Sequence, residues 1–459
     1  MSCQGHDPMG SESQQVMEQV EPNAILPTRR NWVSFSSLLV LQTQNAFNDK
    51  AAQFLLIPLG GALMSSLPSA AGLEYLLGAL IVLPFILFAP LAGWLSDRFS
   101  KTIIIRGAIL LQFAVLLLIL FAVWQQNLLL AITGFFLLSV ESVLLSPAKR
   151  GIVKELVGHN RLGFASGILE MTVVLAVCAG QILSSKWFDL NLKNLEALHP
   201  GDISNGWNAA LIPLAVVTVA ALPTIFISFG IERKPAMGKR KFEIGILWEH
   251  FAQLKELWIH RRLRLSSAGI AFFWGFAGFL NLVAIQMGKD TSGGGVGFGS
   301  DIAWLMFAAT GGIAAGGVVS SLICRKNIEL GLVPIGGAMM VIGSMALALT
   351  PIDSVWIKTW IVITGAGGAT LLVPLNAYLQ DICPPNKRGR IIAGLNLLDC
   401  IAGLIAVIIQ ASMAKYGVSY FTQFTILAGV ALAATCYSAK LVPHHFARLL
   451  SSTLLSWRK

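Results

Sequence analysis

Twelve long apolar stretches, nearly free of charged side chains, constrain this chain more than any other feature of its sequence. Three of them, at residues 75–96, 107–140 and 302–324, contain no Lys, Arg, Asp or Glu. A helix needs about 20 apolar residues to cross a bilayer, and only helices and closed barrels satisfy their backbone groups in lipid. Because the stretches lack the alternating pattern of barrel strands, we predict an all-α membrane protein with twelve transmembrane helices.

Composition supports the bilayer as the solvent for most of the chain. Only 12% of the residues are charged and 55% are hydrophobic, whereas soluble domains carry about 25% charged residues. A soluble core could not bury this much apolar surface. The predicted spans are residues 34–62, 74–95, 104–124, 128–147, 162–184, 208–230, 265–287, 302–323, 329–350, 355–380, 390–412 and 419–440.

The net charge of +10 is distributed unevenly between the loops. Alternate loops hold 21 Lys and Arg residues on one side of the predicted membrane and 5 on the other. Loops rich in Lys and Arg stay in the cytoplasm, so we expect a multi-pass protein with both termini cytoplasmic. The basic residues then set the topology and contact membrane lipids, and we do not expect nucleic acid as a partner.

The longest cytoplasmic connection divides the chain into two halves of six spans. We expect a disordered cytoplasmic tail at residues 1–31, an N-terminal half at 32–231, a cytoplasmic linker at 232–264, a C-terminal half at 265–440 and a basic cytoplasmic tail at 441–459. Within the linker, Leu247, Phe251, Leu254 and Trp258 recur on one helix face. This amphipathic helix lies either in the membrane interface or against the bundle as an ordinary linker helix.

The two halves repeat each other in sequence. Gly93 recurs as Gly317, and Pro147 recurs as Pro374, at offsets of 224 and 227 residues. Parallel repeats related by an axis along the membrane normal occur in transporters. The repeat therefore indicates a duplicated helical transporter.

Several motifs resemble those of one transporter family. Residues 93–101 are similar to the signature G-x-L-x-D-R-x-G-R/K of the major facilitator superfamily, with Ser100 in place of the second glycine. Residues 45–50 resemble A-F-N-D-N and residues 146–151 resemble S-P-A-K-Y-G, from which Lys50 and Arg150 depart. Further matches lie at residues 87–93, 329–336, 373–377 and 384–390.

Together these motifs resemble the bacterial lysophospholipid transporters of that superfamily, over roughly residues 34–440. The resemblance implies the major facilitator fold of two six-helix halves. It also implies a flippase that carries lysophospholipids from the outer to the inner leaflet of the bacterial cytoplasmic (inner) membrane by alternating access. A separate acyltransferase would then re-acylate the lipid inside.

Polar and ionisable side chains within the spans are the candidates for a transport path, because placing a charge in lipid costs about 3 kcal/mol on insertion scales. The predicted path comprises Asn45, Asn48, Asp49, Lys50, Gln53, Glu141, Lys149, Arg150 and Glu170. On span one, a polar stripe that a cavity or partner helices must cover consists of Gln42, Asn45, Asn48, Asp49 and Gln53. The alternatives are a structural pair between Asp49 and Lys50, and hydrogen bonds between helices for Glu141 and Glu170.

A lysolipid headgroup suggests roles for these charges. Its phosphate would prefer Lys50, Lys149 or Arg150, and an ethanolamine ammonium would prefer Asp49, Glu141 or Glu170. Asp399 in span eleven is a further buried charge. Asn376 and Gln380 on span ten are expected to hold helices together, and the aromatic residues of span seven either pack or line a wall for the acyl chain.

The turn after span two is a candidate cytoplasmic gate formed by Gly93, Asp97, Arg98 and Lys101, as the resemblance implies. A carboxylate favours a helix N-terminus and attracts nearby cations, so Asp97 is suited to cap a neighbouring helix. The alternative is a turn that only sets topology. Ser321 stands at the equivalent of Asp97 in the second half, so the two halves are not equivalent at the gate.

Other function classes find little support in the sequence. It shows no nucleophile–base set, paired cysteine spacing or phosphate-binding loop, and all seven His lie outside the predicted spans. We therefore expect neither an enzyme, nor a metal site, nor a cofactor. The alternative function is a superfamily carrier of a small soluble solute or drug, working by uptake or efflux and coupled to protons through Asp49 or Glu141.

Overall fold

The structure, a computed structural model, describes residues 28–158, 162–233, 243–325, 327–384 and 387–441, which fold almost wholly into helices. The elements are α2 (Arg29–Leu63), η1 (Pro68–Ala70), α3 (Leu73–Arg98), α4 (Lys101–Trp124), α5 (Leu128–Val157), α6 (Leu162–Leu198), α7 (Ser204–Ser228), α8 (Ile246–Ile259), α9 (Arg261–Ser292), α10 (Phe298–Ile323), α11 (Leu332–Leu349), α12 (Trp356–Ile382), α13 (Arg388–Lys415), α14 (Tyr420–Ser438) and η2 (Ala439–Leu441). Most of the two predicted tails, residues 1–27 and 442–459, lies outside the described residues.

Within the described ranges, eleven helices are long and apolar enough to cross a membrane. Helix α2 is a twelfth long helix of 35 residues, and its polar side chains lower its hydropathy. Every predicted span falls on one of these twelve helices, which confirms the all-α membrane fold. Helix α2 begins at Arg29, close to the expected start of the first half.

Helix α6 is longer than its predicted span. It runs for 37 residues, past the expected end at residue 184, and it includes Lys186 and Lys193, which were expected in a loop. No helix-breaking residue occurs between them and the Pro200–Gly201 pair. The apolar span therefore ends before the helix does.

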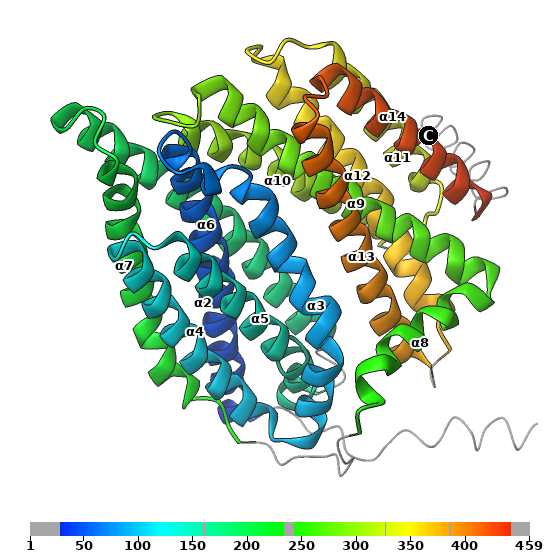
Figure 1. Cartoon of the computed structure of the whole chain (residues 1–459). Helices are drawn as coiled ribbons and strands as arrows, with labels where there is room; N and C mark the ends of the chain where they lie inside the picture. The colour runs from blue at the N-terminus through cyan, green and yellow to red at the C-terminus, as the bar shows by residue number, and fades with distance from the viewer. Residues whose placement is uncertain (1–27, 159–161, 234–242, 326, 385–386, 442–459) are drawn as a thin grey trace, which may run out of the picture.

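The helix contacts of the first half recur in the second. Helix α2 packs on α6 and α7, and α4 packs on α5 and α7; correspondingly, α9 packs on α13 and α14, and α11 packs on α12 and α14. The contacts between the halves also form a matched pair, α3 with α13 and α10 with α6. This matching pattern of helix contacts confirms the two six-helix halves. They lie side by side in Figure 1, the first coloured blue to green and the second green to red.

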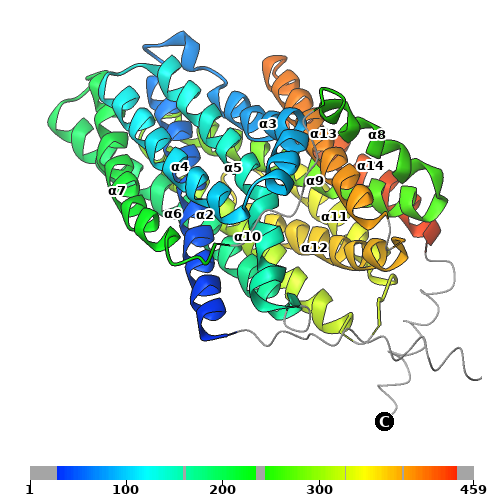
Figure 2. The ribbon, with the colours of Figure 1, turned by 90° about the horizontal axis from the view of Figure 1, so that it is seen from below.

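Helix α8 connects the halves and packs on α13, α3 and α9. Leu257 is buried, and a Cβ built on Gly394 of α13 would lie 2.8 Å from the backbone carbonyl oxygen of Gln253. The other face of α8 leaves Trp248 and Trp258 exposed. The helix thus packs on the bundle and keeps an aromatic face free; Figure 2 shows it beside α13.

We call the end of the bundle at which α2 begins the proximal end, and the opposite end the distal end. At the distal end the halves meet backbone to backbone. A Cβ on Gly61 would lie 2.7 Å from the Gly294 carbonyl oxygen, and one on Gly299 would lie 2.3 Å from the Ser185 carbonyl oxygen. Gly294 also has a φ of +77°, which favours glycine. Small residues thus bring the two halves into close contact there.

Candidate functional site

A cavity of about 1030 Å³ lies between the two halves. Helices α2, α3 and α5 line it from the first half, α9, α12 and α13 line it from the second, and α8 contributes to its proximal side. Its lining reaches Asp97, Arg150 and Gly389, which are exposed at the proximal end. Because the halves are in contact at the distal end, the cavity opens at the proximal end.

The cavity walls combine a few polar groups with a large apolar surface. Lys50 and Gln53 line it from α2, and Asn281, Asn396 and Asp399 line it from the second half. The apolar lining comes mainly from α3 and α13, and includes Ile81, Val82, Phe85, Ile392 and Val407. Few convergent polar groups on apolar walls are typical of a ligand site.

Most of the predicted α2 stripe faces away from this cavity, into the first half. Asn45 Nδ2 donates to Glu141 Oε2 at 3.2 Å, and Ser142 Oγ donates to Asp49 Oδ2 at 2.5 Å. Asn48 Nδ2 donates to Gln112 Oε1 of α4 at 3.4 Å. These hydrogen bonds join α2 to α4 and α5. Asn45, Asn48, Asp49 and Glu141 therefore form a buried polar network behind the cavity wall.

Lys50 points in a different direction from Asp49. Its Nζ donates to Gln53 Oε1 at 2.9 Å, and both side chains line the cavity. Adjacent helix residues are about 100° apart, so one helix serves the inner network with Asp49 and the cavity with Lys50. None of the ion pairs among the described residues joins Asp49 to Lys50, so the structure does not support the alternative of a structural pair between them.

The remaining predicted path residues do not converge on Lys50. Arg150 lines the cavity at its exposed proximal rim. Lys149 is partly buried on α5 and Glu170 is exposed on α6, and neither belongs to the described cavity lining. The structure thus separates the predicted path into an inner network, a cavity pair and peripheral charges.

The candidate gate residues also divide. Gly93 and Asp97 line the proximal part of the cavity, opposite Gly389 near the start of α13. Arg98 is exposed. Lys101 at the start of α4 instead pairs with Glu155 near the end of α5, inside the first half. Of the candidate gate residues, Gly93 and Asp97 are thus the two that line the cavity between the halves.

Sequence reasoning missed part of the second wall. Asn376 and Gln380 line the cavity, although they were expected to hold helices together. The aromatic residues of span seven, which were expected either to pack or to line a wall, divide between the two roles: Trp274 of α9 lines the cavity and is 49% exposed, whereas its neighbour Phe273 is buried. The sequence showed that these two polar residues share one face of span ten. It did not show whether that face contacts other helices or the cavity.

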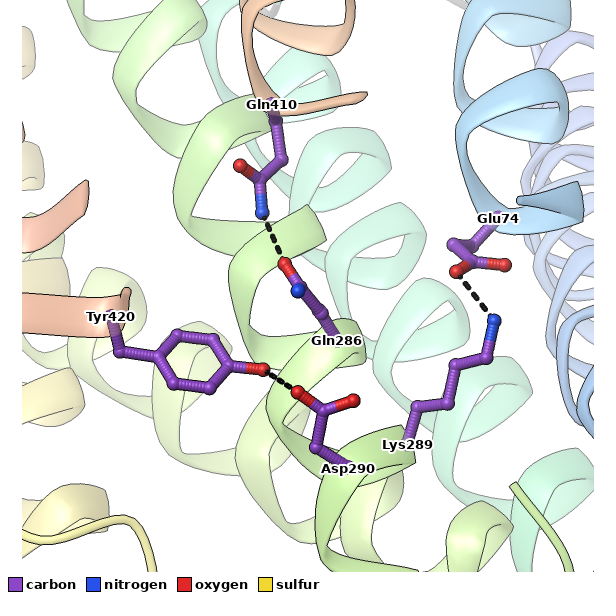
Figure 3. Close-up of polar contacts among 6 residues, drawn as sticks. All are labelled: Glu74, Gln286, Lys289, Asp290, Gln410 and Tyr420. Atoms are coloured by element: carbon purple, nitrogen blue, oxygen red, sulfur yellow. Dashed lines mark hydrogen bonds and ion pairs between the residues drawn. The ribbon is translucent and has the colours of Figure 1, made fainter. Parts of the chain in front are cut away.

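Side-chain contacts reinforce the distal seal. Lys289 Nζ lies 3.0 Å from Glu74 Oε1, joining α9 to α3 across the halves. Within the second half, Tyr420 donates to Asp290 and Gln410 donates to Gln286 (Figure 3). The end of α9 is therefore fixed to three other helices.

A second polar contact between the halves seals the distal end near α6. Asp189 of α6 accepts hydrogen bonds from the Gly297 N–H at 2.5 Å and from Ser300 Oγ at 2.6 Å. Both donors lie at the start of α10. The distal end is thus closed at α3–α9 and again at α6–α10.

A family model described as Major Facilitator Superfamily matches residues 38–407. With its paired six-helix halves and the cavity between them, the chain belongs to this superfamily, and it is a membrane transporter rather than an enzyme. Its relatives include LplT, named a lysophospholipid transporter, from Photorhabdus laumondii, which is 27% identical over 393 residues that cover 84% of this chain and 90% of that protein. LplT of Pectobacterium carotovorum is 25% identical and covers 88% of this chain and 91% of that protein.

Solved structures of other superfamily transporters share the fold. The inward-open xylose transporter XylE from E. coli superposes with a TM-score of 0.65 at 14% identity, covering 89% of this chain and 96% of that one. An inward-facing bacterial homologue of the human lysosomal transporter Spinster gives 0.61 at 17% identity, covering 94% and 98%.

Proposed function

We propose that this protein moves lysophospholipids from the outer to the inner leaflet of a bacterial cytoplasmic membrane by alternating access. The observation that carries the proposal is the cavity, which places the ammonium of Lys50 beside extensive apolar walls. At about 1030 Å³ it is just above the roughly 300–1,000 Å³ typical of ligand pockets. The lysophospholipid transporters among its relatives support the same substrate class.

The apolar walls suit an acyl chain. Helices α3 and α13 are close near Gly403, where a Cβ would lie 3.7 Å from Val82. Toward the proximal end, Asp97 and Gly389 stand on opposite sides of the cavity. An acyl chain lying along these walls gains about 0.8 kcal/mol for each CH₂ removed from water. The amphipathic substrate therefore matches both parts of the lining.

The charge distribution supports an inward-facing orientation of the cavity. The loops rich in Lys and Arg lie at the proximal end, which the positive-inside rule places in the cytoplasm together with both termini. The cavity then opens inward, in the form that releases lipid to the inner leaflet. A separate acyltransferase would convert the released lysolipid into a phospholipid.

The proposal is tested with purified protein in liposomes. Fluorescent lysophosphatidylethanolamine is added to the outer leaflet, and the fraction that albumin can no longer extract is followed with time. Liposomes with protein should protect the lipid at least about tenfold faster than empty liposomes. Equal rates in both preparations would refute lysophospholipid transport.

Asp49→Asn should abolish this transport while the protein remains folded. The substitution alters the carboxylate that accepts from Ser142 of α5 at 2.5 Å, and so weakens the contact that fixes the α2 segment carrying Lys50. A monodisperse peak in size-exclusion chromatography checks folding. Asp353→Asn, in an exposed distal loop, is the matched control. Transport near the wild-type rate would remove Asp49 from the mechanism.

A proton-coupled carrier of a soluble solute is the second candidate. Asp49 Oδ1 and Glu141 Oε1 are both buried, and neither has a hydrogen-bond partner within the described part of the chain. Buried carboxyls of this kind occur in proton relays. Solute flux that collapses when an ionophore dissipates the proton gradient, with no lysolipid movement, would favour this function.

A further inference from the structure

The cavity contains a partly buried carboxylate that the predicted path did not use. Asp399 lies on α13 and lines the cavity. Its Oδ1 atom is buried and has no hydrogen-bond partner among the described residues, and none of the ion pairs found there involves it. An unpaired charge within a membrane span is costly. A ligand that supplies a cation would remove this cost.

The complementary charge stands on the other half. Lys50 lines the same cavity, and an ammonium has three donors, of which one reaches Gln53. Lys50 lies 13 residues before the distal end of α2, which is about 20 Å along the helix. Asp399 lies 16 residues before the distal end of α13, which is about 24 Å along the helix. The two charges therefore occupy similar depths. The other charged lining residues, Asp97 and Arg150, are exposed at the proximal end.

We propose that Lys50 and Asp399 together bind a zwitterionic phospholipid headgroup, with the phosphate at Lys50 and the ammonium at Asp399. This inference rests on the proposed function and specifies its substrate class. Trp274 lines the cavity from α9, which packs on α13, and its ring face attracts a cation. A phosphoethanolamine group satisfies both charges. A phosphoglycerol group satisfies Lys50 and leaves Asp399 unpaired.

Because the two charges belong to different halves, the bound headgroup also connects them. Lys50 is carried by α2 and Asp399 by α13. Each half presents one partly buried charge to the cavity, and the zwitterion neutralises both. The correct headgroup therefore draws the halves toward each other, whereas an anionic headgroup attracts only the first half.

The test compares two headgroups on the same acyl chain. Purified protein in liposomes is given lysophosphatidylethanolamine or lysophosphatidylglycerol, each labelled on the acyl chain, and protection from albumin extraction is measured. The wild-type protein should prefer the ethanolamine lipid by about tenfold or more, as expected for one charge-assisted hydrogen bond. Asp399→Asn should lose this preference by slowing the ethanolamine lipid alone.

Two further variants separate charge from structure. Asp399→Glu keeps the carboxylate and should keep the preference, and Lys50→Gln should slow both lipids, since each carries a phosphate. Asp353→Asn, in the exposed distal loop, should change neither rate. If Asp399→Asn does not fold, the wild-type protein is tested by competition. Glycerophosphoethanolamine should then inhibit transport at lower concentration than glycerophosphoglycerol.

The outcomes distinguish this inference from the function on which it rests. If the wild-type protein moves neither lipid, the proposed function fails. If it moves both lipids equally, or if Asp399→Asn slows both equally, the headgroup site is refuted while lysophospholipid transport stands. Equal inhibition by the two competitors would also refute the headgroup site.

Discussion

Replacing Lys289 by glutamine should open the distal end of the bundle. Lys289 Nζ lies 3.0 Å from Glu74 Oε1, and the side chains of Lys289 and Glu74 are only 13% and 6% exposed. At this distance the attraction is about 5.5 kcal/mol for an effective dielectric constant near 20. Desolvation offsets much of it, which leaves about 1.5–3 kcal/mol for a charge-assisted hydrogen bond. The ratio of open to closed distal ends should therefore rise roughly 10- to 160-fold.

The shift is measurable as a distance between the halves. Spin labels are placed at Leu198 and Val355, which are 71% and 81% exposed at the distal end, in a cysteine-free background. Double electron–electron resonance then reports the separation in lipid nanodiscs. If the wild-type protein is open in about 1% of molecules, the variant should be open in about 10–60%. The longer distance should appear only in the variant.

A cation at the same end provides the control. Lys193 is exposed on α6, and Lys193→Gln makes the same chemical change without breaking an ion pair. It should leave the distance distribution unchanged. Glu74→Gln should reproduce the Lys289→Gln distribution, and the double variant should add little, because both changes remove one interaction. A Lys289→Gln distribution identical to that of the wild type would refute the reasoning.

Two further substitutions test the packing. Gly299→Ala would place a Cβ 2.3 Å from the Ser185 carbonyl oxygen, so the same resonance experiment should show a longer distal distance; an unchanged distance would mean that α10 absorbs the methyl group. Glu155→Gln breaks the pair with Lys101, whose side chains are 18% and 15% exposed, and should cost about 1–2 kcal/mol of stability. Thermal unfolding measures this loss, with Glu256→Gln as the control, because the more exposed pair of Glu256 with Lys387 should contribute under about 1 kcal/mol. Equal melting temperatures for the two variants would contradict the expected difference.

The fold was predictable because lipid imposes a simple rule on sequence. Each span had to be a run of apolar residues long enough to cross the bilayer, and the repeated Gly93 and Pro147 marked the halves. The extension of α6 was missed for the same reason. Hydropathy detects the part of a helix in lipid, whereas the helix itself continues until the Pro200–Gly201 pair.

The site was only partly predictable. Lys50 and Gln53 were chosen as path residues, and they line the cavity. Asp49 and Glu141 were chosen by the same criterion, but they face the interior of the first half. A polar stripe indicates that a helix face is kept away from lipid. It does not indicate whether that face contacts another helix or lines a cavity. Asp399 was left out of the predicted path, and the cavity that it lines forms only when both halves are assembled.

We expect helix α8 to couple the transport cycle to the surrounding lipid. It packs on α13 and α9 of the second half as well as on α3, and its backbone approaches Gly394 of α13 closely, so we expect it to move mainly with the second half. Trp248 and Trp258 project from its free face, 69% and 48% exposed, where interfacial helices place aromatic rings among lipid headgroups. We therefore expect each cycle to move two indole rings through the headgroup layer, so that the turnover rate should fall as the viscosity of that layer rises.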